Sequence, residues 1–117
     1  RHFHKATSLD NYFAPAWLGY GHTFAAQDET DQALAAYRTA SRFFSGCHLP
    51  PLCTAMEHCK TGNLQLAEQF LSHAKGMCGT DPLVHNEIGV VLYHQHNFVE
   101  AAAAFENVLS LVDGGAG

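Results

Sequence analysis

The stretch WLGYGHTFAAQDETDQALAAYRTA, residues 17–40, decides the fold, because its pattern of small and bulky residues returns twice further along the chain. When the sequence is shifted against itself by 34 residues (from 33 to 67 to 101), chemically similar residues align without any insertion. The aligned columns are Ala33, Ala67 and Ala101; Tyr37, Leu71 and Phe105; Ala40, Ala74 and Val108; Gly21, Ala55 and Gly89; and Phe24, His58 and Leu92. Such a fixed period predicts an internal structural repeat.

A 34-residue period with these small and bulky positions is typical of the tetratricopeptide repeat, a hairpin of two antiparallel helices. Gly or Ala where the helices cross lets the backbones approach, and the bulky residues fill the space beside the crossing. Each hairpin leaves one face uncovered, so neighbouring hairpins must stack. The sequence therefore predicts an all-α tetratricopeptide-repeat solenoid, a right-handed α-α superhelix of helical hairpins.

The period also sets the expected boundaries. We expect repeats at 14–47, 48–81 and 82–113, preceded by the second helix of a truncated repeat (1–13) and followed by a frayed Gly-rich tail (114–117). Because the chain begins inside a predicted helix and without Met, we expect it to be a piece of a longer protein. The expected helices are 1–9, 15–27, 30–44, 50–60, 64–77, 83–95 and 98–112.

Local signals agree with these limits. Pro15 and Pro82 suit the first turn of a helix, and Asp81 is a ready N-cap before Pro82. The turns inside the hairpins are expected at 28–31, 62–63 and 96–97, where Asp, Gly and Asn tolerate a tight backbone.

Composition excludes several classes of function. The chain has 117 residues, 47% of them hydrophobic, and a net charge of -5; beyond Arg42 its only basic residues are Lys60 and Lys75. No basic stripe could follow a phosphate backbone, so we expect no nucleic-acid partner. No apolar run is long enough for a bilayer, and no signal peptide is recognisable, so we expect no membrane partner. Four cysteines without a CxxC pair indicate reduced thiols in an intracellular protein: Cys47, Cys53, Cys59 and Cys78.

The concave surface of such a solenoid is lined by the first helix of each hairpin, and it is the expected partner-binding groove. Inward-facing residues recur at i, i+4 and i+7 along those helices. They are Leu18, His22 and Ala25; Leu52, Met56 and Cys59; and Asn86, Val90 and Tyr93. This largely apolar stripe suits an extended or helical segment with apolar side chains. The alternative is that some of these residues belong to the core, covered by a neighbouring repeat.

Two other uses of the repeat fit the residues poorly. A clamp for a C-terminal carboxylate needs Lys, Arg and Asn on these helices, whereas the nearby cation here is Lys60. A ladder of Asn residues at one recurring position, as in repeats resembling those of the nuclear sugar transferase, is replaced by Gly19, Cys53 and Glu87. The acidic residues are read mostly as solvated charges at turns and on outer helix faces.

The nine histidines do not form a recognisable metal site. His94 and His96 lie on either side of a predicted helix end, His58 and Cys59 point to different sides of one helix, and Cys53 is about 240° from Cys59 around that helix. We therefore expect neither a metal nor any other cofactor.

A catalytic site is equally poorly supported. Cys47 and His48 are adjacent, but adjacency alone does not give the geometry of a nucleophile and its base. We expect a protein that is not an enzyme.

Several segments carry a more specific resemblance, which covers roughly residues 1–112. They are FAPAWLGYGH (13–22), DQA (31–33), AAY (35–37), GCHLP (46–50), LAEQF (66–70), DPLV (81–84) and ExGVV (87–91). In these segments the chain resembles the cell-division-cycle protein sixteen family, subunits of the anaphase-promoting complex (cyclosome). The GCHLP link is the most discriminating part, because the Ala and Gly columns would match any tetratricopeptide protein.

The resemblance implies a role beyond generic binding. Members of that family are non-catalytic scaffold subunits of a ubiquitin ligase that acts in cell-cycle progression and mitosis, in the nucleus and cytoplasm. Their C-terminal repeats enclose a small helical subunit, and their N-terminal repeats form homodimers. The resemblance places this chain in the C-terminal array, so the groove residues become candidate contacts with that subunit and homodimerisation by this chain is not expected. A free-standing adaptor of the chaperone or trafficking type is the alternative.

Overall fold

A computed structural model describes residues 14–116 of the chain and the side chains of residues 16–112. The helix predicted at 1–9 and the truncated repeat at 1–13 lie outside the described residues. The described part consists of helices and turns, with no strand between residues 14 and 116. Its helices are α2 (Ala14–Ala26), α3 (Thr30–Phe43), α4 (Leu49–Lys60), α5 (Leu64–Met77), α6 (Pro82–His94) and α7 (Phe98–Ala116).

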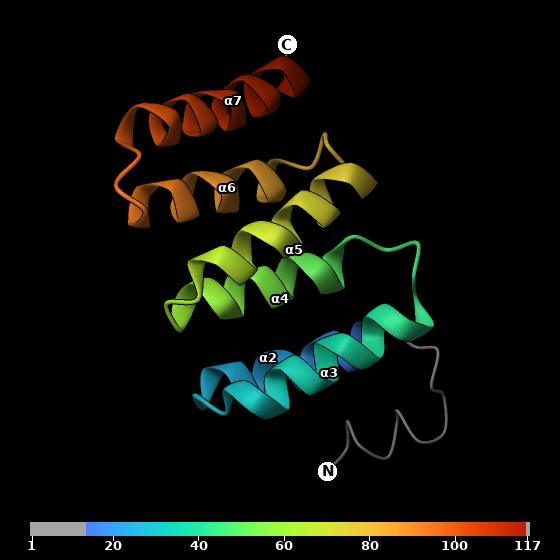
Figure 1. Cartoon of the computed structure of the whole chain (residues 1–117). Coiled ribbons are helices and arrows are strands. Elements are labelled where there is room, and N and C mark those ends of the chain that lie inside the picture. The colour runs from blue at the N-terminus through green and yellow to red at the C-terminus, as the bar shows by residue number, and fades with distance from the viewer. Residues whose placement is uncertain (1–13, 117) are drawn as a thin grey trace.

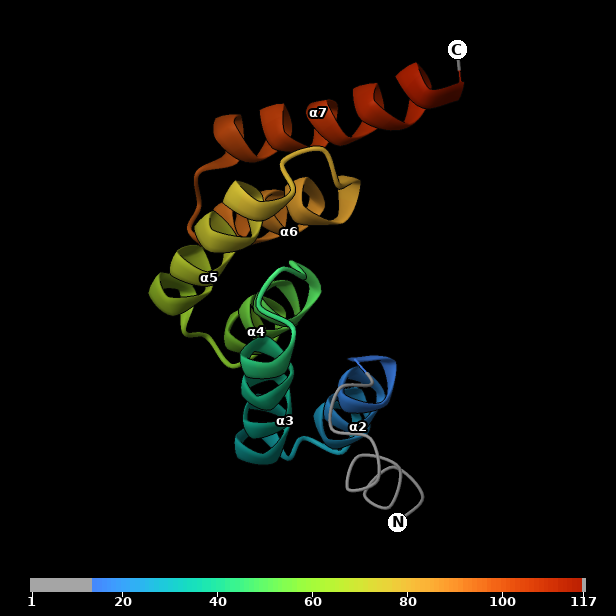
Figure 2. The ribbon, with the colours of Figure 1, turned by 90° about the vertical axis from the view of Figure 1, so that its right-hand side faces the viewer.

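The helices form three antiparallel hairpins, α2/α3, α4/α5 and α6/α7, stacked in chain order (Figure 1). A quarter-turn about the vertical axis shows that the stack is curved, with α2 at one end and α7 at the other (Figure 2). The stack measures 45 × 33 × 20 Å along its principal axes. The predicted all-α fold of stacked hairpins is confirmed.

The small-residue column lies where the two helices of a hairpin cross. A Cβ atom added to Gly21 would stand 2.8 Å from Cδ1 of the Tyr37 ring, and one added to Gly89 would stand 2.7 Å from Cε1 of Phe105. Both distances are too short for carbon atoms in contact. In the first and third hairpins the crossing therefore needs glycine opposite an aromatic ring, and in the second hairpin the same positions hold Ala55 and Leu71.

The core runs through the interfaces between hairpins. Its main cluster joins buried residues of α4, α5 and α6, and a smaller one joins α3 to α4. The main cluster is Leu52, Ala55, Ala67, Leu71, Ala74, Val84 and Val91; the smaller is Ala33, Tyr37 and Cys53. Because each cluster draws on consecutive hairpins, no hairpin buries its apolar face alone.

The turns inside the three hairpins share one backbone conformation, at positions 34 residues apart. Asp28, Gly62 and His96 all have positive φ, at 60°, 87° and 65°. The next residue donates its N–H to the carbonyl five residues earlier, as from Asn63 to His58 over 2.8 Å. This is the Schellman pattern that closes helix C-termini. The turns were predicted at these positions; the positive φ of a histidine was not.

The link between the second and third hairpins is fixed by side chains. Asp81 caps α6 by accepting from the Leu83 N–H at 3.0 Å, and it also bonds to His48 at the start of α4. His85 bonds to the Gly79 carbonyl on the same link. The predicted N-cap is confirmed, and the His48 contact ties two hairpins together.

The described helices match the predicted ranges to within one residue, except at the end of α7. The last helix was expected to end at residue 112, but α7 continues to Ala116. Glycine lowers helix propensity without forbidding the helical backbone, and no proline interrupts the segment. The predicted end of the last helix was wrong for this reason.

Candidate partner-binding groove

The structure divides the nine predicted groove residues into three groups by exposure. Met56 is 46% exposed and Tyr93 is 56% exposed, and His22 and Asn86 are also exposed. Four are half-buried: Leu18, Ala25, Cys59 and Val90. Leu52 is only 2% exposed. The exposed residues come from all three first helices, so they can contact one partner segment along the stack.

Leu52 is a correction to the predicted set. Its side chain lies in the main core cluster with Val84 and Val91 of α6. The next hairpin covers this position of α4, so Leu52 cannot meet a partner without unfolding the interface. Leu18 at the same offset is half-buried against the smaller cluster. Asn86 stays exposed, because no further hairpin of the described chain covers α6 there.

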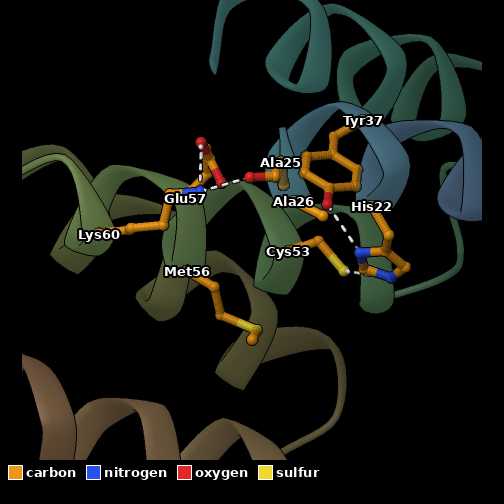
Figure 3. A pocket seen from close by; sticks show the side chains of 8 residues that line it. All are labelled: His22, Ala25, Ala26, Tyr37, Cys53, Met56, Glu57 and Lys60. Carbon is orange, nitrogen blue, oxygen red and sulfur yellow. Dashed lines mark hydrogen bonds and ion pairs between the residues drawn. The ribbon is translucent and has the colours of Figure 1, made fainter. Parts of the chain in front are cut away.

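A hollow of about 310 Å³ lies between the first two hairpins, where α2, α3 and α4 meet (Figure 3). Its lining is His22, Ala25, Ala26, Tyr37, Cys53, Met56, Glu57 and Lys60. Met56 projects away from the Tyr37 ring, toward the next layer of helices (Figure 3). A hollow of this size can take a large side chain of a bound segment.

His22 connects the exposed groove to the buried side chains below it. Its Nδ1 lies 2.8 Å from the Tyr37 hydroxyl, and its Nε2 lies 4.0 Å from the Cys53 sulfur. Burial raises the pKa of Cys53 to about 11, and the neighbouring Cys47 adds to the shift. Burial also raises the pKa of the Tyr37 hydroxyl. Both groups stay protonated at neutral pH, which makes Cys53 a poor nucleophile.

Lys60 is occupied by contacts within the chain. Its Nζ donates to the Ala25 carbonyl at 2.6 Å and lies 3.4 Å from Asp28 and 3.6 Å from Glu57. Glu57 is 4% exposed and also accepts from the Thr30 hydroxyl at 2.9 Å. The expectation that acidic side chains are solvated was wrong for Glu57, which joins α4 to the turn of the first hairpin.

Five residues that line the hollow were not among the predicted groove residues: Ala26, Tyr37, Cys53, Glu57 and Lys60. Tyr37 is the one hydroxyl in a column otherwise filled by Leu71 and Phe105, and a buried hydroxyl needs a partner. The need of the Tyr37 hydroxyl for a hydrogen-bond partner could have indicated the contact with His22. Nothing in the local sequence signals that Glu57 is buried.

The described residues hold no group of three or more His, Cys, Asp or Glu side chains arranged to bind a metal ion. Between residues 14 and 116, no helix is both long and apolar enough to cross a membrane.

Comparisons with known proteins confirm the resemblance seen in the sequence, although no family model matches. The chain is 53% identical over 110 residues to anaphase-promoting complex subunit 6 of Arabidopsis thaliana. It is 43% identical over 112 residues to the subunit cut9 of Schizosaccharomyces pombe, and 42% identical over 112 to the human cell division cycle protein 16 homolog. These matches cover 94–96% of the chain but only 20%, 17% and 18% of the relatives.

Solved structures give the same result. The chain superposes on the crystal structure of the APC/C hetero-tetramer Cut9–Hcn1 with a TM-score of 0.89 and 42% identity, over 97% of this chain and 21% of that one. The MamA crystal structure matches with a TM-score of 0.82 but 18% identity, over 97% of this chain and 67% of that one, which supports the fold alone. This chain is a tetratricopeptide-repeat solenoid.

Proposed function

We propose that this chain is a non-catalytic scaffold segment of an anaphase-promoting complex subunit, and that its groove holds a segment of a small helical partner subunit. The proposal rests on the similarity to subunit 6, cut9 and the human homolog, each of which is about five times longer or more. Since Cut9 was solved together with Hcn1, a counterpart of Hcn1 is the partner we propose. Such a role would place the protein in the nucleus and cytoplasm and in the cell cycle.

The observation that carries the groove assignment is the exposure of large apolar side chains on the first helices of the hairpins. Met56 of α4 and Tyr93 of α6 are about half exposed, beside half-buried Val90. Exposed apolar side chains that line up along one face favour contact with another protein. The repeat boundaries at 14–47, 48–81 and 82–113 stay part of this proposal.

An adaptor that clamps a C-terminal carboxylate has less support. Lys60 is the single Lys or Arg on α2, α4 and α6. Its ammonium group is already bonded to the Ala25 carbonyl and paired with Asp28 and Glu57. A carboxylate entering the groove would have to displace these contacts.

The experiment is affinity capture of the parent protein from mitotic cells, with identification of the co-purifying subunits. Met56→Glu places a charge on the proposed groove and should abolish capture of the partner subunit. Leu66→Glu is the matched control, because Leu66 is 38% exposed on α5, a second helix of its hairpin. If both variants capture the partner subunit as well as the unaltered protein does, the partner contact lies elsewhere. If no ligase subunit co-purifies with the unaltered protein, the proposed function is wrong.

A further inference from the structure

Glu87 is a buried carboxyl at the border of the proposed groove. It lies on α6 and is 9% exposed. At 100° per residue, its direction falls between the core side of the helix, marked by Val84 and Val91, and the exposed side, marked by Asn86. Its carboxyl group is therefore close to the groove while most of its surface is covered.

No Lys or Arg of the described residues forms an ion pair with Glu87. The ion pairs found among residues 14–116 join His48 to Asp81 and Lys60 to Asp28 and Glu57, and none includes Glu87. Helix α6 carries no Lys or Arg, and the one Lys of α4 is Lys60. The nearby Cys59 thiol lowers the pKa of Glu87 as a side-chain donor, but a thiol donates weakly.

An ionised carboxyl in this position costs stability. Burial raises the pKa of Glu87, and the Cys59 thiol and the nearby His94 only partly offset the shift. A buried carboxyl with a shifted pKa at the border of a groove is a candidate for a binding site. The net charge of -5 also favours a basic partner.

We infer that Glu87 binds an arginine side chain of the segment held in the groove, with an apolar side chain of that segment beside it against Met56 and Tyr93. The inference rests on the proposed function and adds the chemistry of the partner. A guanidinium group matches a carboxylate with two parallel N–H bonds and is less strongly hydrated than an ammonium, so it enters a half-covered site at lower cost.

The test uses two small probes of the same shape on the full 117-residue chain. Hexylguanidinium carries an apolar chain and a cationic head, and hexylurea carries the same chain with a neutral head. Binding is followed by NMR, with the side-chain carboxyl carbon of Glu87 as reporter. Hexylguanidinium should bind about tenfold more tightly, the ratio that 1.4 kcal/mol of pairing gives. Its binding should also lower the measured pKa of Glu87, which hexylurea should not.

The variants assign the effect to one residue. Glu87→Gln should remove the tenfold preference, while Glu100→Gln, which removes the same charge from an exposed position of α7, should keep it. Equal binding of both probes to the unaltered chain, or a preference that survives Glu87→Gln, would overturn the inference. The pKa readout on the unaltered chain decides the question even if Glu87→Gln fails to fold.

Capture of the partner subunit separates this inference from the proposed function. If Met56→Glu abolishes capture and Glu87→Gln leaves it unchanged, the groove holds its partner without an arginine on Glu87 and the inference falls alone. If Met56→Glu leaves capture unchanged, the proposed groove itself is wrong. If both variants reduce capture and Glu100→Gln does not, both stand.

Discussion

Replacing Gly21 by leucine tests the helix crossing that the 34-residue period implies. A Cβ at this position would stand 2.8 Å from Cδ1 of Tyr37. The Tyr37 ring cannot move aside easily, because it is 2% exposed and its hydroxyl is bonded to His22 at 2.8 Å. Overpacking of a core contact outweighs the gain in helix propensity, so we expect a net loss of about 1–3 kcal/mol.

The assay is urea denaturation followed by circular dichroism, with thermal melting as a second readout. For a chain of this length, the expected loss lowers the melting temperature by about 4 °C for each kcal/mol. Gly76→Ala is the control: Gly76 lies within α5 and a Cβ there meets nothing within 4 Å. It should stabilise the chain by about 0.5–1 kcal/mol. A Gly21→Leu variant as stable as the unaltered chain would refute the assignment of Gly21 to the crossing.

Three further predictions concern the turns, the buried Glu87 and the helix cap Asp81. His96→Gly should stabilise the chain by about 0.5 kcal/mol, since His96 has φ 65°, whereas Gly62→Ala at φ 87° should destabilise it by about 1 kcal/mol; urea midpoints check both. Burial raises the folded-state pKa of Glu87, so its penalty is absent below the unfolded pKa of about 4.3 and complete above the folded pKa. Glu87→Gln should therefore gain stability over the unaltered chain at pH 7.5 but not at pH 4, and equal differences at both pH values would contradict the assignment. Asp81→Ala should cost about 1 kcal/mol by removing the α6 cap. Burial alone would raise the pKa of Asp81, but the bonds from His48 and the Leu83 N–H outweigh burial and lower that pKa. The stability that Asp81 contributes should therefore be present above its unfolded pKa and lost as the pH falls through its folded pKa. A cost of Asp81→Ala that does not shrink on acidification would contradict this prediction.

The fold could be predicted from the sequence because the repeat reports on packing inside one hairpin. Gly21 with Tyr37 and Gly89 with Phe105 are each separated by 16 residues (37 − 21 and 105 − 89), so one local pattern describes both contacts. The turns at Asp28, Gly62 and His96 follow the same period. These contacts and turns lie within one hairpin, between residues that are close in the sequence.

The groove could be predicted only in part, because exposure depends on the angle between hairpins. Leu52 and Met56 fit the inward stripe equally well in sequence, yet α6 covers Leu52 and leaves Met56 exposed. Glu57 and Glu87 are buried by contacts with other hairpins, and an acidic residue within a helix carries no local sign of this. Glu87 was considered only as a position where an Asn ladder is absent, so the sequence did not predict it as a groove residue.

The central claim is that the concave groove, and not the outer face of the stack, contacts a ligase subunit. The most direct test places a photo-crosslinking residue at position 56 of α4 in one version of the parent protein and at position 66 of α5 in another. Irradiation in mitotic cells should link position 56, and not position 66, to a small subunit of the anaphase-promoting complex. Crosslinks to that subunit from position 66 alone, or from neither position, would contradict the account.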